Sequence, residues 1–391
     1  MRCLALLALL FAPLSPAPAE APMAALAADA EVQWVPFDLT PGNQIRFEMT
    51  VNGRRAVAVL DTGVSQTVAS QRFAAALGLK PVTIGRADAI GGSVPVGWAT
   101  IESLSLGALT RTGGRIAVAD LKAAATGGDA PIELLVGSDI LAAHALEIDY
   151  DARRFRLLRS GRLPFTGVNV PLRIAPASGV VTSELAIGAR RFRPLIVDTG
   201  DGSAVTLSRE SWGAAGVPPA TFTSAYAFGL GGPIETDLTV VPMVKLAGLT
   251  ARNVELRIER QGGFSAQTGT AGRIGSGFLQ RYRVLLDPRA GRMVLAPGKA
   301  ADRQPVKSTS GLLIAYQEGA LTVLHVMRNS PAAANGWRAG ERICSIDGAR
   351  VPANYLSSNL AAWPADTPGR TVKLGLCGRG GDRDLTLSHF Y

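Results

Sequence analysis

The sequence predicts a mainly β protein in which two homologous β lobes are followed by a third unit of strands and short helices. Apolar residues alternate in short runs broken by Gly, Asn-Gly or Pro, which is typical of strands and hairpins. A block of about 130 residues occurs twice, and the pattern changes from about Ala300. The 391 residues, of which 47% are hydrophobic and 18% charged, are enough for two or three globular domains.

The N-terminus has the pattern of a secretory signal. Arg2 precedes an apolar run, and the small residues "APA" end at Ala19, which predicts a signal peptide over 1–19 and cleavage before Glu20. The apolar run is about a dozen residues, shorter than the roughly 20 that span a bilayer. We therefore expect a secreted or periplasmic protein that is not an integral membrane protein after cleavage, with a flexible leader at 20–30.

Charge and rare residues argue against several function classes. The net charge is +9, but the Lys and Arg residues are scattered singly, so we expect a solvated basic surface and no nucleic-acid partner. The three histidines, His144, His325 and His389, are far apart and fit no metal-ligand spacing. No cofactor fingerprint occurs, so we expect neither a metal nor a cofactor.

The internal repeat defines the two lobes. "IRFEMTVNGRRAVAVLDTG" aligns with "VTSELAIGARRFRPLIVDTG", and later segments keep the same register with one inserted residue. We place the copies at 31–160 and 161–299. Within them, "SQRFAAALGL" and "SRESWGAAGV" predict short helices. "AIGGSVPVGW" and "FGLGGPIETD" predict glycine-rich hairpins, which are either mobile covers over a cleft or plain turns.

Each copy ends an apolar run with an aspartate, Asp61 and Asp198, that is followed at once by Thr-Gly. A charge at the end of a buried strand is costly unless something uses it. Two carboxylates held within hydrogen-bonding distance share a proton, because both cannot ionise cheaply. One can then act as a base toward water while the other acts as an acid toward a carbonyl.

With both Asp-Thr-Gly segments in matching positions, each followed by an apolar-Gly element, the chain resembles the aspartic proteases of the pepsin and retropepsin type. The resemblance covers roughly 270 residues and implies a bilobal acid-protease fold with Asp61 and Asp198 as the catalytic pair. It also implies an endopeptidase acting on peptides or unfolded proteins. The supporting residues that it implies are Thr62 and Thr199, which bond across to the partner loop, Gly63 and Gly200, which allow tight turns, and Gly137 and Gly275 in the apolar-Gly elements.

Three residues depart from the family pattern. Val64 and Asp201 follow the two Asp-Thr-Gly segments where Ala, Ser or Thr is usual, and Arg273 stands where an apolar residue is expected. Asp201 could raise the pKa of the pair or point to solvent. These departures keep open an alternative, a protease-like scaffold that binds peptides and cuts them weakly or not at all.

Residues 300–391 form a polar linker and the third unit. "SPAAANGWRAGERICSIDGARV" and the final hairpin resemble a PDZ domain of the bacterial protease-associated kind. The resemblance implies peptide binding by strand addition at a loop formed by Gly311, Leu312, Leu313 and Ile314. On sequence alone Cys344 and Cys377 could pair or stay free, and the resemblance favours a disulfide by placing them on strands that could be neighbours. We expect a monomer.

Overall fold

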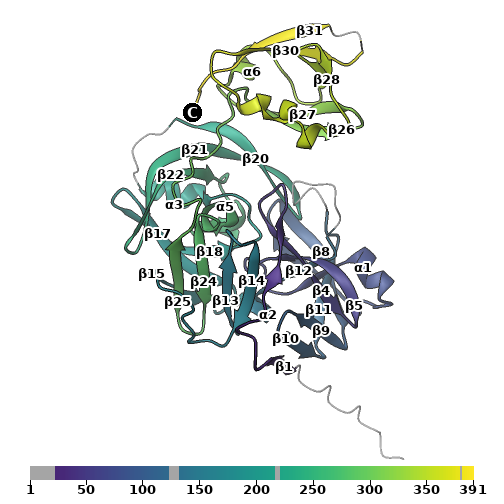
Figure 1. Ribbon diagram of the computed structural model, residues 1–391, viewed down its shortest axis with the longest axis vertical. Coiled ribbons are helices and arrows are strands. Elements are labelled where there is room, and N and C mark those ends of the chain that lie inside the picture. Colours follow the sequence, from purple (N-terminus) through teal and green to yellow (C-terminus); the bar gives the residue numbers. More distant parts are fainter. Residues whose placement is uncertain (1–22, 123–131, 216–220, 379–380) are drawn as a thin grey trace, which may run out of the picture.

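The computed structural model describes residues 23–122, 132–215, 221–378 and 381–391. The predicted signal peptide at 1–19 and the start of the predicted leader lie outside the described residues. Figure 1 shows a mainly β protein, as the sequence predicts, in which three sheets make up the larger body and a fourth makes up the C-terminal unit.

The first sheet has eleven strands in the order β1-β10-β9-β4-β5-β12-β6-β11-β8-β7, and β3 pairs with β4. Helix α1 (Gln71–Ala76) follows β6 and begins as predicted, because the Ser70 side chain accepts a 3.1 Å hydrogen bond from the Phe73 N–H. The strands are β1 (Met23–Leu26), β3 (Asp38–Leu39), β4 (Ile45–Val51), β5 (Arg54–Leu60), β6 (Val68–Ser70), β7 (Thr83–Ala89), β8 (Gly92–Thr100), β9 (Ser103–Leu106), β10 (Leu109–Thr112), β11 (Arg115–Ala119) and β12 (Leu134–Val136).

The second sheet repeats the central pairing of the first. β18 and β23 are parallel as β5 and β12 are, and β19 lies between β23 and β22 as β6 lies between β12 and β11. Helices α3 (Arg209–Ala215) and α4 (Phe264–Gln267) flank it. Its strands are β16 (Arg173–Ile174), β17 (Val181–Ile187), β18 (Arg190–Asp198), β19 (Val205–Leu207), β20 (Thr223–Gly229), β21 (Gly232–Leu246), β22 (Leu249–Ile258) and β23 (Gly272–Gly275).

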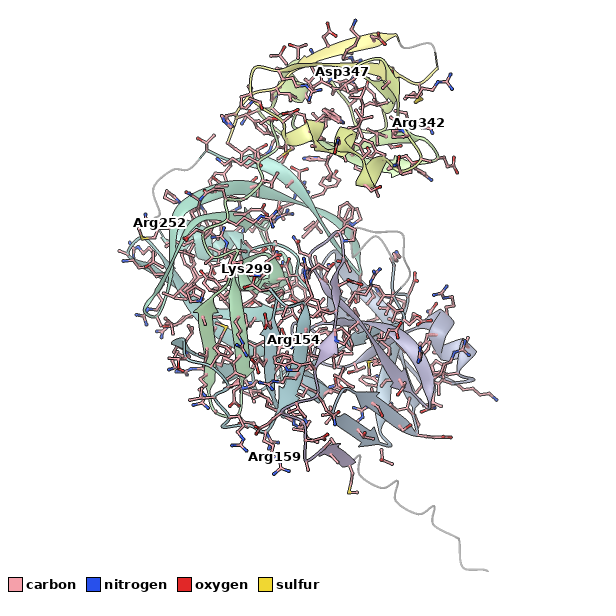
Figure 2. The ribbon with its side chains drawn as sticks, in the orientation of Figure 1. Arg154, Arg159, Arg252, Lys299, Arg342 and Asp347 are labelled. Carbon is pink, nitrogen blue, oxygen red and sulfur yellow. A yellow bond between two sulfur atoms is a disulfide. The ribbon has the colours of Figure 1, made fainter. Side chains whose placement is uncertain are left out.

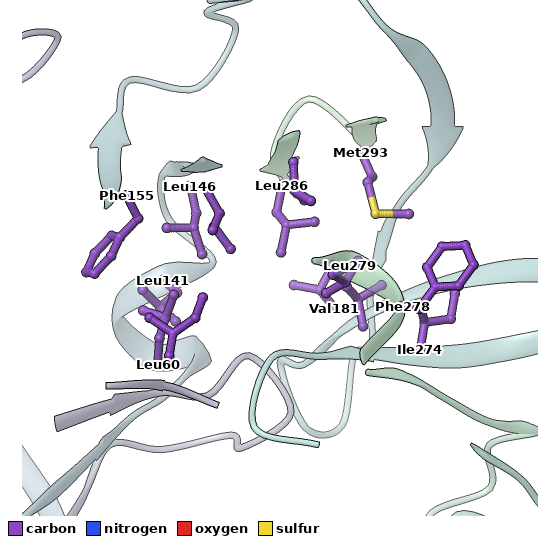
Figure 3. Close-up of a cluster of buried hydrophobic side chains, with 14 of the residues drawn as sticks. Leu60, Leu141, Leu146, Phe155, Val181, Ile274, Phe278, Leu279, Leu286 and Met293 are labelled. Carbon is purple, nitrogen blue, oxygen red and sulfur yellow. The ribbon is translucent and has the colours of Figure 1, made fainter. Parts of the chain in front are cut away.

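A six-stranded sheet joins the two halves, because β13 pairs with β24. It contains β2 (Val35–Pro36), β13 (Ala145–Asp149), β14 (Arg154–Leu158), β15 (Val168–Pro171), β24 (Tyr282–Asp287) and β25 (Arg292–Pro297). Helices α2 (Ser138–Leu141) and α5 (Ser276–Leu279) precede β13 and β24. One continuous apolar cluster spans both halves, from Leu60 and Phe155 to Val181 and Phe278 (Figure 3). Each such side chain contributes about 1.5–3 kcal/mol on burial, so the cluster stabilises one arrangement of the two halves.

The expectation of a flexible leader is wrong for residues 23–30. Strand β1 pairs antiparallel with β10, and Met23 lies opposite Thr112. Ala30 is buried. The open edge of β10 supplies backbone partners that the sequence pattern of the leader does not reveal, and backbone pairing satisfies polar groups whatever the side chains are.

The C-terminal unit consists of a six-stranded sheet with its own apolar core, which includes Leu321, Ile343, Trp363 and Val372. Cys344 on β28 and Cys377 form a disulfide. The elements are β26 (Leu312–Gln317), β27 (Ala320–Val326), α6 (Pro331–Ala334), β28 (Arg342–Ile346), β29 (Ala349–Arg350), the 3₁₀ helices η2 (Tyr355–Ser357) and η3 (Asn359–Ala365), β30 (Thr371–Leu376) and β31 (Asp382–Thr386).

This unit rests on strand β20 of the second sheet (Figure 1). The His325 ring stacks on Tyr226 with 4.3 Å between ring centroids and shares a 2.8 Å hydrogen bond with Ser224. The Thr223 hydroxyl donates to the Arg328 carbonyl at 2.6 Å, and the Arg328 guanidinium pairs with Asp237. The linker therefore leads to a docked unit and not to an isolated one.

In the part of the chain that the structure describes, no helix has the length and apolar character needed to cross a membrane. Figure 2 labels basic side chains from the lower end of the molecule to the C-terminal unit, on strands β14, β22 and β28 and on the segments that follow β14 and β25. These are Arg154, Arg159, Arg252, Lys299 and Arg342.

Candidate active site

The two aspartates lie on matching loops that face each other. Asp61 follows β5, and its N–H donates to the Val136 carbonyl of β12 at 3.0 Å. Asp198 ends β18 and lies opposite Gly275 in the pairing with β23. The Asp198 carboxyl lies beside Gly63 of the first loop, and the Asp61 carboxyl lies beside Gly200 of the second, so the two carboxyl groups face each other. The structure thus brings together two residues that are 137 positions apart in the sequence.

The threonines that follow the aspartates bond across the interface in both directions. The Thr62 hydroxyl donates to the Val197 carbonyl at 2.6 Å and accepts from the Thr199 N–H at 3.1 Å. The Thr199 hydroxyl donates to the Leu60 carbonyl at 2.7 Å and accepts from the Thr62 N–H at 3.0 Å. All of these groups are buried, so four mutual hydrogen bonds fix the loops to each other.

The adjacent glycines leave room for the opposing carboxyl group. A Cβ placed on Gly63 would lie 2.3 Å from the Asp198 Cγ, and one on Gly200 would lie 2.3 Å from the Asp61 Cγ. Both distances are impossible for real atoms, so only glycine fits. The Gly63 N–H donates to Asp61 at 3.0 Å, and the Gly200 N–H donates to Asp198 at 2.9 Å.

Gly137 and Gly275 lie where the second element of each half passes its aspartate loop. A Cβ on Gly137 would lie 2.6 Å from the Gln66 carbonyl carbon, and one on Gly275 would lie 2.3 Å from the Ser203 carbonyl oxygen. The next residues complete the contact. The Ser138 hydroxyl donates to the Thr62 carbonyl at 3.0 Å, and the Ser276 hydroxyl donates to the Thr199 carbonyl at 2.8 Å. These serines are not among the residues singled out from the sequence, although the signal is present, because a serine follows the glycine directly in both copies of the repeat.

The environment of the pair favours a shared proton. Burial raises the pKa of Asp61 to about 6, against the lowering effect of the Gly63 N–H. Burial, with the charges of Asp61 and Asp201, raises the pKa of Asp198 well above its ordinary value. A pair of this kind retains a proton at pH values at which an exposed aspartate has lost it.

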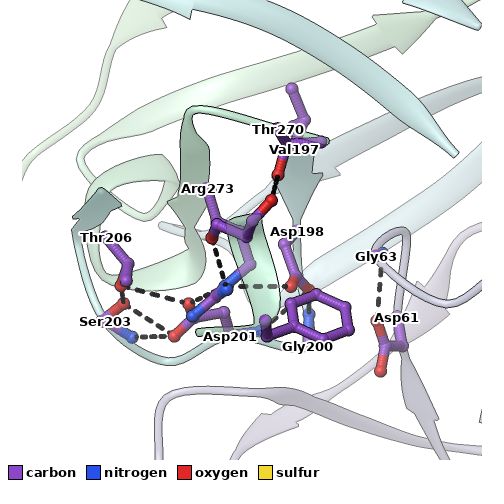
Figure 4. Close-up of polar contacts among 12 residues, drawn as sticks. Asp61, Gly63, Val197, Asp198, Gly200, Asp201, Ser203, Thr206, Thr270 and Arg273 are labelled. Atoms are coloured by element: carbon purple, nitrogen blue, oxygen red, sulfur yellow. Dashed lines mark hydrogen bonds and ion pairs between the residues drawn. The ribbon is translucent and has the colours of Figure 1, made fainter. Parts of the chain in front are cut away.

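The second half carries charges that the first half lacks. Arg273 is buried and contacts Asp201 at 2.9 Å and Glu259 at 2.7 Å, and its Nε is 3.9 Å from Asp198 (Figure 4). Asp201 therefore points into the protein, and the alternative of a solvent-facing side chain is wrong. The sequence singled out Asp201 and Arg273 separately but gave no sign of their contact or of Glu259.

A cavity of about 610 Å³ opens beside the two aspartates. Its walls are mostly apolar and come from both sheets, including Val64, Leu135, Trp98, Ile196, Phe228 and Phe264. The predicted glycine-rich hairpins form as β7–β8 and β20–β21. Their tips meet over the cavity, where the Gly231 N–H donates to the Ile90 carbonyl at 3.0 Å. The arrangement can hold an extended chain with a backbone carbonyl near two carboxyl groups.

Residues 47–140 match the family model of the aspartyl proteases. The matched stretch contains Asp61 and Gly137, whereas Asp198 lies outside it. This match supports a peptidase of the aspartyl protease family. No curated protein is similar enough to the chain to match it.

The other predicted binding loop lies on the C-terminal unit. β26 is an edge strand of its sheet, with β27 as its neighbour. Gly311 precedes it with a φ of +78°, and a Cβ there would lie 2.0 Å from the Ser330 Cβ. Leu312 is buried, while Leu313 and Ile314 are partly exposed. Among the described residues, no cluster of three or more His, Cys, Asp or Glu side chains could hold a metal ion.

Proposed function

We propose that the chain is a secreted or periplasmic aspartic endopeptidase with two homologous lobes, 31–160 and 161–299. The observation that supports this most strongly is the reciprocal geometry of Asp61 and Asp198. Each loop donates to and accepts from the other through Thr62 and Thr199, and each glycine makes room for the opposite carboxyl. A scaffold that only bound peptides would not require two carboxyl groups that share a proton.

The proposed reaction begins with a water held between the two carboxyl groups. The ionised carboxyl group takes a proton from this water while the water oxygen bonds to the peptide carbonyl carbon. The protonated carboxyl group gives its proton to the carbonyl oxygen. The tetrahedral diol then collapses as the C–N bond breaks. The first carboxyl protonates the leaving nitrogen and the second takes a proton from the diol, so the pair returns to its starting state.

The substrate class follows from the cavity. Its apolar walls fit apolar side chains of a peptide, and the hairpin tips would close over the extended backbone. A folded protein does not offer such a segment, so unfolded proteins and peptides are the proposed substrates.

The experiment that tests this function is incubation of the purified protein with a peptide library from pH 3 to pH 8. Mass spectrometry identifies the products. A matched peptide in which a hydroxyethylene group replaces the scissile bond mimics the diol, and we expect it to bind at least about 100-fold more tightly than the substrate. Library members that are bound and recovered uncut at every pH would support the scaffold alternative instead.

For the C-terminal unit we propose a PDZ domain that captures peptides along the free side of β26. An edge strand with apolar side chains at Leu313 and Ile314 suits strand addition. The test is competition by a peptide with a free C-terminus and an apolar last residue. This peptide should raise the KM for an unfolded protein but not for a short peptide substrate. The same peptide with an amidated C-terminus, which lacks the carboxylate, should raise that KM less. Equal inhibition of both substrates would refute this role.

A further inference from the structure

The internal repeat allows each residue near the aspartates to be compared with its counterpart in the other half. Asp201 and Val64 both follow Asp-Thr-Gly directly. Ile196 on β18 lies opposite Arg273, just as Val59 on β5 lies opposite Leu135. Arg273 in the second half thus takes the place of Leu135 in the first.

The counterpart of Glu259 in the first half is found from the pairing of β11 and of β22. Ala119 on β11 pairs with Ser70, the residue that precedes α1, and Glu259 follows Ile258, which pairs with Leu207, the residue before Ser208. Glu259 therefore corresponds to Ala119. The second half has Asp201, Glu259 and Arg273 where the first half has Val64, Ala119 and Leu135, and these three apolar side chains belong to one cluster beside the cavity.

Stability does not explain why the second half has three charged residues where the first half has apolar ones. Taking ions out of water is costly, and a buried ion network is often no more stable than apolar residues of similar size. The first half has the same strand pairing with an apolar trio, so the fold does not need the charges. Arg273 is 2% exposed and Glu259 is 1% exposed, so the charges do not serve solubility either.

The geometry directs the charged trio toward the catalytic pair. Nε of Arg273 contacts Asp201 at 2.9 Å and faces Asp198 at 3.9 Å, whereas Nη1 on the far side contacts Glu259 at 2.7 Å and the Ser265 hydroxyl at 3.1 Å. The Asp201 N–H also donates to Asp198 at 3.0 Å. Two carboxylates and one guanidinium leave the trio with a net negative charge. After burial and the partner carboxyl group, the charge of Asp201 raises the pKa of Asp198 most, and by more than either Arg273 or the Asp201 N–H lowers it.

The other charged groups around the pair are held in ion pairs of their own or are exposed. In the first half, Asp139 accepts from the Thr67 N–H at 2.7 Å and is paired with Arg111 at 3.2 Å. Arg257 on β22 is bound to Glu255 at 3.0 Å and to the Tyr226 carbonyl at 2.8 Å. Asp88 and Lys122 lie at the cavity with exposed side chains of opposite charge. In the half that carries Asp61, the counterpart of Asp201 is the apolar Val64. The trio is therefore the main fixed charge that acts on one side of the pair.

We propose that Asp201, Glu259 and Arg273 are positioning residues that keep the Asp61–Asp198 pair singly protonated up to neutral pH. This inference rests on the proposed proteolytic function. Asp201 supplies a negative charge from outside the pair, and Arg273 holds that carboxylate in place and prevents it from taking up the proton itself. Burial alone would raise the pKa of Asp201, but Arg273 and the hydrogen bonds from Ser203 outweigh burial and lower it. The proton consequently stays on the catalytic pair.

The test compares the pH dependence of kcat/KM, from pH 4 to pH 9, for the wild type, Asp201→Asn and Glu259→Gln. We expect Asp201→Asn to move the basic limb to lower pH by about one unit, because one negative charge beside Asp198 is removed. Glu259→Gln should move it less, since Glu259 contacts the far nitrogen of Arg273. Glu147→Gln is the matched control, because Glu147 is a fully buried carboxylate of the joining sheet that is paired with Arg156 and Arg283.

Two further measurements make the outcome decisive. The triple variant Asp201→Val, Glu259→Ala, Arg273→Leu copies the first half and should fold, with its basic limb also at lower pH. ¹³C NMR titration of the Asp61 and Asp198 carboxyl groups in the wild type and Asp201→Asn reads their protonation without any cleavage. Unchanged titration and an unchanged basic limb in Asp201→Asn would overturn the proposal. A titration shift in a protein that cuts no peptide would instead uphold the electrostatic role and refute the proteolytic function.

Discussion

Replacing Thr62 with valine should destabilise the interface between the two halves, because valine has the same shape but no hydroxyl. The change removes the bond to the Val197 carbonyl at 2.6 Å and the bond from the Thr199 N–H at 3.1 Å. Both partners are buried and would be left without a replacement. Each such group costs about 1–3 kcal/mol, so the free energy of unfolding should fall by about 2–6 kcal/mol.

Urea unfolding followed by circular dichroism measures this loss, with Thr62→Ser as the matched control. Serine keeps the hydroxyl and loses one methyl group, so its cost should be about 1 kcal/mol. Activity should fall with stability, because a loop displacement of about 1 Å can cost about 100-fold in rate. The reasoning would be refuted if Thr62→Val were no less stable than Thr62→Ser, or if Thr199→Val, which removes the mirror-image bonds, had no effect.

Three further predictions concern other parts of the molecule. Gly63→Ala should lower kcat/KM at least about 100-fold, because the new Cβ would lie 2.3 Å from the Asp198 Cγ. Gly213→Ala is the control and should keep its activity, because a Cβ there meets no atom within 4 Å. Similar activities of the two variants would contradict the packing. Reduction of the Cys344–Cys377 disulfide, which closes a loop with a sequence separation of 33, should destabilise the C-terminal unit by about 3–4 kcal/mol and leave the transition of the three other sheets unchanged in calorimetry. Removing residues 298–391 takes away the His325 and Arg328 contacts on β20 and β21, so kcat/KM for a short peptide should fall modestly. Unchanged kinetics would show that docking does not affect the hairpin.

The internal repeat made the most important features predictable. A repeat reports on local pattern, and the strands, the hairpins and helix α1 depend largely on local alternation, turn residues and caps. These local features need no knowledge of which distant segment packs against which. The pairing of Asp61 with Asp198 is different, because it follows from the resemblance to the aspartic proteases and not from the positions of the two residues at the ends of apolar runs.

Contacts between distant segments that are not copies of each other could not be predicted from the sequence. Nothing in the sequence links Glu259 to Arg273 or places His325 on Tyr226, because each pairing depends on how strands are arranged in space. The pairing of residues 23–26 is hidden from the sequence for the same reason, since the edge of β10 that holds β1 is created only by folding. Arg273 was a visible departure from the pattern, and it marks the position at which the two halves differ in charge.

The central claim is that Asp61 and Asp198 act as one catalytic unit, and the most direct measurement is the turnover of one cleavable peptide by the wild type, Asp61→Asn, Asp198→Asn and the double variant. Groups that act as a unit show non-additive losses. We therefore expect each single variant to lose at least about 1,000-fold in kcat, and the double variant to lose little more. Substantial turnover by either folded single variant, or losses that multiply in the double variant, would contradict the account.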